Sequence, residues 1–111
     1  MSDVRDLRPI TLQREPGCAT VSLTGTVNIM LADELLQAAR QAASAPRVVV
    51  RLEDVEHLDT AALQVLVALR HAVGLGGGAC EVMGVPERVA GYLRLAGLIE
   101  AVTGTADREP G

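Results

Sequence analysis

Two short runs rich in β-branched residues open the chain, at residues 10–13 and 19–23, and Glu15-Pro16-Gly17 lies between them. A Pro-Gly pair suits the two central positions of a type II turn, because proline fixes φ near −65° and glycine accepts a positive φ. The pattern therefore predicts a β-hairpin.

Beyond Thr26 the apolar residues recur at helical spacing, at Leu31, Leu35, Ala38, Ala39 and Ala42. This period predicts a helix over residues 31–43, which ends before Pro46. The β-branched run at residues 47–52 follows, with acidic residues after it, and it predicts a central strand that is covered on at least one face.

A second helix is predicted over residues 60–73, ended by a glycine-rich segment at 74–78, and a strand follows at 79–83. Strand, helix and strand form a βαβ crossover, whose two strands are parallel. The carboxyl end of the first strand then lies beside the start of the helix at Thr60. A last helix is predicted from Pro86, at its first turn, to about Leu95, with Gly97 as its left-handed stop and Leu98-Ile99 folding back onto the core.

This order, ββαβαβα, predicts an α/β fold in which a mixed β-sheet packs against helices. At 111 residues we expect one domain over the whole chain, 1–111, with a frayed polar tail from about Thr103. The hydrophobic residues, 49% of the chain, occur in short runs, so no direct membrane insertion is expected. The amino-terminal residues carry no apolar signal region, which favours a cytoplasmic location.

The charge balance narrows the classes of partner. The net charge is −4 and Tyr92 is the only aromatic residue, so the chain has neither a basic surface for nucleic acid nor a platform for stacking bases. All ten cationic side chains are arginine, which removes lysine-dependent chemistry such as Schiff bases and phosphate-loop lysines. Cys18 and Cys80 lie far apart in the sequence and are interpreted as small core residues.

Other chemical signals are weak. The glycine-rich segment follows a helix and precedes a strand, the reverse of the order in a phosphate-binding loop. His57 and His71 have no third ligand at zinc spacing, and the acidic residues Glu53, Asp54, Glu56 and Asp59 form no compact oxygen cage. We therefore predict no metal, no cofactor and no enzymatic activity.

The start of the helix at Thr60 carries the strongest functional signal. Asp59 is placed to cap the helix, which leaves the Thr60 hydroxyl exposed at the first helical position. Thr60, Gln64, Val67 and His71 share one narrow arc of this helix, and the opposite side is apolar. On spacing alone, Thr60 is interpreted as an ordinary surface or capping residue.

An ordered set of features resembles the STAS domain family, the anti-sigma-factor antagonists and their relatives. The resemblance covers residues 20–99. It consists of a hydrophobic strand at 48–52, an acidic loop at 55–58, the Asp59-Thr60 pair opening a helix that reaches Leu69-Arg70, Gly76-Gly77-Gly78 before a strand, and the segment from Leu93 to Leu98.

The resemblance implies a mixed sheet with helices and a bacterial partner-switching protein. In anti-sigma-factor antagonists the Ser or Thr after this Asp is phosphorylated by the kinase that is also the anti-sigma factor, and a phosphatase reverses the reaction. By position that residue is Thr60. The chain departs from the family in having Ala61-Ala62 where a glycine often follows the phosphorylated residue.

A protein partner should then bind the edge around Thr60. Asp59, Thr60, Gln64, Val67 and His71 are candidate contact residues. Asn28, Met30 and Leu31 could complete the surface, although a turn role for Asn28 and a core role for Met30 and Leu31 are alternatives. A second function of the same edge is constitutive docking, without phosphorylation, as a STAS accessory subunit on the ATPase of a lipid-trafficking ABC transporter or on a chemosensory complex.

Overall fold

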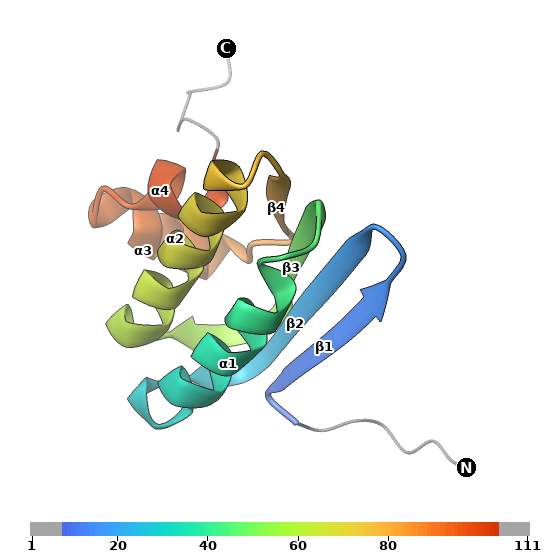
Figure 1. Cartoon of the computed structure of the whole chain (residues 1–111). Helices are drawn as coiled ribbons and strands as arrows, with labels where there is room; N and C mark the ends of the chain where they lie inside the picture. The colour runs from blue at the N-terminus through green and yellow to red at the C-terminus, as the bar shows by residue number, and fades with distance from the viewer. Residues whose placement is uncertain (1–7, 105–111) are drawn as a thin grey trace.

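The computed structural model describes residues 8–104 (Figure 1). The strands are β1 (Ile10–Glu15), β2 (Cys18–Val27), β3 (Arg47–Leu58) and β4 (Ala79–Met83). The helices are the 3₁₀ turn η1 (Ile29–Leu31), α1 (Ala32–Ala42), α2 (Thr60–Leu75), α3 (Glu87–Leu95) and α4 (Ile99–Thr103).

The four strands form one mixed sheet in the order β1-β2-β3-β4. β1 and β2 are antiparallel, and their register ends on the pair Glu15–Cys18, so the predicted Pro16-Gly17 turn closes the hairpin with Gly17 at φ +81°. β2, β3 and β4 run parallel to one another. The α/β class and the parallel βαβ unit predicted from the sequence are confirmed.

All helices lie on one face of the sheet (Figure 1). Val48 and Val50 of β3 point into the core on this face, whereas Val49 between them lies on the other face. The core is aliphatic, and its largest fully buried side chains are Leu23, Leu35, Leu52, Leu58, Leu63, Leu66 and Leu93. Burial of these residues fixes the position of α2 against the sheet.

The opposite face of the sheet carries no helix in the described part of the chain (Figure 1). Arg47 donates to Glu81 at 2.9 Å and Arg51 to Glu53 at 2.7 Å, on either side of Val49, which is only 8% exposed. The hydrogen bond from Arg51 lowers the pKa of Glu53 below its usual range. Glu53 is therefore ionised and paired at neutral pH.

Several boundaries differ from those predicted. β1 and β2 are longer, and α1 is one residue shorter at each end. β3 continues to Leu58 because Val55 and Leu58 are buried, and two irregularities in its register with β2 keep both facing inward, so the predicted acidic loop at 55–58 is strand. α2 extends two residues further, to Leu75. Pro86 is the N-cap of α3 and not its first helical residue. The elements η1 and α4 were not predicted as helices.

The carboxyl-terminal segment folds back as predicted. Gly97 is in the left-handed region at φ +73°, and Leu98 and Ile99 pack against the core. Thr103, where the frayed tail was predicted to start, is the last residue of α4 and Gly104 caps it at φ +79°. The rest of that tail, residues 105–111, lies outside the described residues.

The two cysteines are free and half-buried. Cys80 packs against the core, in line with the prediction, whereas Cys18 does not belong to the core. Cys18 faces the helix-free side of the sheet, opposite Arg47 in the register, and Cys80 faces the helices. Their positions on opposite faces exclude a disulfide within the chain. Burial raises the pKa of the Cys80 thiol, which makes it a poor nucleophile at neutral pH.

Candidate docking site at the start of α2

Asp59 joins the start of α2 to the η1 turn. One carboxylate oxygen accepts a hydrogen bond from the Thr60 amide at 2.6 Å, and the other accepts from the Ile29 amide at 3.2 Å. The Asp59 amide itself donates to the Val27 carbonyl at 2.9 Å. The predicted cap is thus present, and it also holds a segment thirty residues earlier in the chain.

The η1 turn presents two large apolar side chains to solvent. The Asn28 side chain accepts a hydrogen bond from the Met30 amide at 2.9 Å, so Asn28 has the turn role that was its alternative interpretation. Ile29 is 68% exposed and Met30 83%, whereas Leu31 is half-buried against the core. Met30 is therefore available to a partner, and Leu31 has largely the core role.

The Thr60 side chain is exposed at the first position of α2. Within the described residues its hydroxyl makes no hydrogen bond, and the first intrahelical bond is donated by Leu63 to the Asp59 carbonyl. The amides of Ala61 and Ala62 have no acceptor in the same part of the chain. Unpaired amides at a helix start favour a negative charge nearby.

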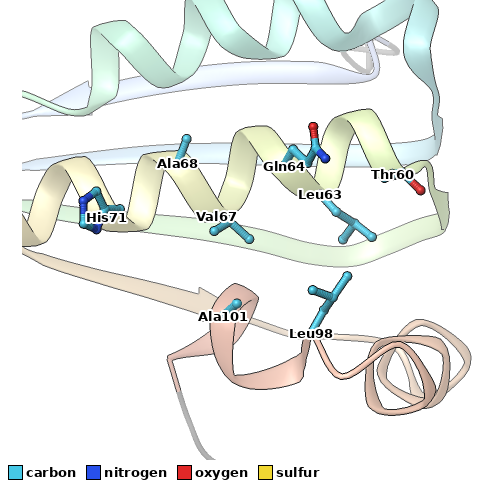
Figure 2. A pocket seen from close by; sticks show the side chains of 8 residues that line it. All are labelled: Thr60, Leu63, Gln64, Val67, Ala68, His71, Leu98 and Ala101. Atoms are coloured by element: carbon cyan, nitrogen blue, oxygen red, sulfur yellow. The ribbon is translucent and has the colours of Figure 1, made fainter.

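A groove of about 450 Å³ lies between α2 and the segment that carries α4 (Figure 2). Leu63 and Val67 of α2 face Leu98 and Ala101 across it, and Ala68 also lines it. Polar groups sit along its length, with Thr60 near one end, His71 near the other and Gln64 between them. The four residues predicted to share an arc of α2 all line this groove.

The structure changes the interpretation of that arc. Val67 was expected as an exposed apolar residue, but it is half-buried and packs against the core at the groove. Leu98, Ala101 and Ile29 were not predicted as site residues, because they reach the site only through tertiary packing. The sequence signal that could have found Ile29 is its place beside Met30 in the segment after β2.

Of the four acidic residues that precede Thr60, Glu53, Asp54 and Glu56 are spread along β3, and Asp59 follows it. Glu53 is held by Arg51, and Glu56 lines a separate hollow together with Arg88 and Tyr92. Of the four acidic side chains, Asp59 alone makes a hydrogen bond to the start of α2 within residues 8–104. Electrostatic effects at Thr60 should thus come mainly from Asp59 and the helix amides.

In the described residues no group of His, Cys, Asp and Glu side chains is arranged to hold a metal ion. None of the helices there combines the length and apolarity that crossing a membrane requires. The site is therefore an exposed hydroxyl, an adjoining pair of exposed apolar side chains and an apolar groove. Such a combination is suited to binding another polypeptide.

Removal of the Asp59 carboxylate should destabilise the fold, because the hydrogen bonds that it accepts from the Thr60 and Ile29 amides are lost. We expect Asp59→Ala to lower the free energy of unfolding by about 1 to 2 kcal/mol, because the helix loses its cap and η1 loses its anchor. Urea denaturation measures this change. Asp54→Ala, which removes an exposed carboxylate on β3 with no hydrogen bond in the described chain, should change stability by less than about 0.5 kcal/mol. Equal effects would contradict the role of Asp59.

The family model described as "Mlab, STAS domain" matches residues 10–103. The chain belongs to the STAS domain family. The match covers all of the strands and helices described above, so the resemblance predicted from the Asp59-Thr60 segment is confirmed. A comparison with curated protein sequences gives no match.

Several solved structures share this STAS fold. An anti-sigma factor antagonist from Mycobacterium paratuberculosis is 27% identical, with a TM-score of 0.65 over 88% of this chain and 86% of that one. The Bacillus cell fate determinant SpoIIAA in its phosphorylated form is 10% identical, with a TM-score of 0.68 over 80% and 84%. A sulfate transporter family protein from Wolinella succinogenes is 21% identical, with a TM-score of 0.66 over 79% and 73%. STAS domains thus occur in signalling antagonists and in transporter proteins.

Proposed function

We propose that this STAS domain is a partner-switching protein of the anti-sigma-factor antagonist type in bacterial signal transduction, built as a single domain without catalytic activity. Its partner is a kinase-type anti-sigma factor in the cytoplasm, which binds the start of α2 and phosphorylates Thr60. A phosphatase returns the chain to its binding state. The observation that carries the proposal is the free, exposed Thr60 hydroxyl at the mouth of an apolar groove.

Phosphorylation of Thr60 alone would be enough to control binding of a partner at the start of α2. A phosphoryl group adds roughly −1.5 to −2 charges at neutral pH. The unpaired amides at the start of α2 partly compensate this charge within the protein, so the fold tolerates it. A partner that covers Thr60 would instead have to bury the charge beside the Asp59 carboxylate, which disfavours the complex.

The groove supplies the attractive part of the interface. An apolar side chain of the partner could fill the space between Val67 and Leu98, while Met30 and Ile29 bind at its edge. Gln64 and His71 offer polar contacts on the same side of α2. The likeness to SpoIIAA supports the proposal, because structures of that protein are known in an unphosphorylated and a phosphorylated form.

Intact-mass analysis of the protein purified from its own host tests the proposal. We expect a fraction of molecules to carry the mass of one phosphoryl group, sensitive to phosphatase and mapped to Thr60 by peptide fragmentation. Thr60→Ala should remove this species, and Thr60→Ser should retain it. A phosphoryl group on another residue, or none under any growth condition, would contradict regulation at Thr60.

The family match favours a second function. The matching model describes the Mlab STAS domain, and Ala61-Ala62 gives a kinase less room than a glycine would at the helix start. Under this alternative the chain is an accessory subunit of a lipid-trafficking ABC transporter or a chemosensory complex, and the same edge docks constitutively on an ATPase. Stoichiometric recovery of the unphosphorylated chain with such a complex, and equal recovery of Thr60→Ala, would favour it.

A further inference from the structure

The outer edge of β1 is an unpaired strand edge in the described structure. β1 is the terminal strand of the sheet and holds six residues without an internal proline. The Thr24 amide donates to the Pro9 carbonyl at 2.9 Å, so by the antiparallel alternation Thr11, Gln13 and Glu15 also bond inward to β2. The amides and carbonyls of Ile10, Leu12 and Arg14 therefore point outward. Such an edge is a template for another strand.

A hollow of about 400 Å³ runs along this edge between β1 and α1. Ile10, Leu12 and Arg14 line its strand side together with Arg8, which precedes β1, and Glu34, Gln37 and Gln41 line its helix side. α1 connects the parallel strands β2 and β3, so it runs opposite to both and in the same direction as β1. Glu34 consequently lies at the Ile10 end of the hollow and Gln41 at the Arg14 end.

We infer that this edge pairs with β1 of a second copy of the chain, antiparallel about a two-fold axis at Leu12. In this register Ile10 lies opposite Arg14 of the second copy, and Leu12 meets its own equivalent. Arg14 of the second copy then reaches Glu34, which makes no ion pair within residues 8–104. Because of the two-fold symmetry, the dimer contains two such Arg14–Glu34 contacts. The charges and the hydrogen-bonding groups of the edge are thus self-complementary.

The spacing of the helices is consistent with this dimer. α1 contacts both β1 and β2, so it lies above the gap between them. With neighbouring strands about 4.8 Å apart, the two α1 axes in the dimer would be about 10 Å apart, which is a packing distance for helices. Ala38, which lines the hollow, provides a small residue where the helices approach. Each copy would fill the hollow of the other.

The pairing leaves the docking site open. Thr60 and the groove residues of α2 and α4 do not line the hollow between β1 and α1, and Ile29 and Met30 lie on η1, before α1 begins. The dimer would therefore display two equivalent docking sites. This inference does not depend on whether Thr60 is phosphorylated.

Sedimentation equilibrium of the full chain tests the pairing. We expect a dimer at low salt that weakens as ionic strength rises, because partly exposed ion pairs are screened. Arg14→Glu should raise the dimer dissociation constant by at least about tenfold, since it puts two like charges together. Glu34→Arg should do the same, and the double variant should recover the wild-type value.

Arg40→Glu is the matched control, because Arg40 is exposed on α1 and does not line the hollow. It should leave the dimer unchanged, and circular dichroism should show that every variant is folded. A wild-type chain that stays monomeric at low salt would overturn the inference, because the β1 edge would then not pair with a second copy. A dimer insensitive to both single variants, or one that the double variant fails to restore, would overturn it as well.

Discussion

Replacement of Thr60 by glutamate is expected to weaken binding of the partner protein by about a hundredfold or more. An interface that covers Thr60 would have to bury an unpaired carboxylate, which costs on the order of 3 to 5 kcal/mol. The neighbouring Asp59 carboxylate carries the same negative charge, so it adds repulsion, and its hydrogen bonds from the Thr60 and Ile29 amides hold it at the start of α2. Isothermal titration calorimetry with the proposed partner, a kinase-type anti-sigma factor from the same host, measures the loss.

Two variants make this experiment specific. Thr60→Ala should bind with the affinity of the unphosphorylated wild type, because the Asp59 cap acts on the backbone amide and survives the substitution. Ser44→Glu adds the same charge at an exposed position before β3, at the end of that strand opposite to Thr60, and should leave affinity unchanged. Wild-type binding by Thr60→Glu, or equal losses for Ser44→Glu, would place the interface elsewhere.

Truncation of Leu66 to alanine should have the largest effect on stability among single changes in α2. Leu66 is 2% exposed and belongs to the core between α2 and the sheet. Loss of a buried leucine side chain leaves a cavity, and such changes cost about 2 to 5 kcal/mol. The expected result is a clear drop in the free energy of unfolding, measured by urea denaturation.

Gln64→Ala is the matched control for Leu66→Ala. Gln64 is exposed on the groove side of the same helix, so its removal should change stability by no more than about 0.5 kcal/mol while weakening partner binding. The pair of variants separates the packing face of α2 from its docking face. A Gln64→Ala variant as unstable as Leu66→Ala would show that the two faces are not distinct.

The fold was largely predictable because its elements carry strong local signals. The Pro16-Gly17 turn, the helical spacing from Leu31 and the glycines after α2 each fix a boundary through backbone preferences. The extent of β3 was not predictable in the same way. Glu53, Asp54 and Glu56 have the composition of a loop, and only pairing with β2 keeps that segment extended.

The sequence predicted the residues of the candidate docking site that lie on α2, but not those that other elements contribute. Helical geometry alone placed Thr60, Gln64, Val67 and His71 on one side of α2. The opposite wall of the groove, Leu98 and Ala101, depends on how the α4 segment packs against α2. The hydrophobic periodicity of the sequence does not predict this tertiary packing. Ile29 is likewise held at the site by a hydrogen bond from its amide to the second oxygen of Asp59. The two residues are thirty positions apart, so the local sequence pattern does not predict this contact.

The placement of every described helix on a single face of the sheet has an evolutionary consequence. On the bare face, polar side chains such as Thr20 and Ser22 pack against no helix, so many substitutions there should be neutral. Selection would then act mainly on the strand residues that face the helices and on Val49, which is buried on the bare face. Sequences with this architecture are free to diverge at such bare-face positions, while the strand residues that face the helices stay apolar.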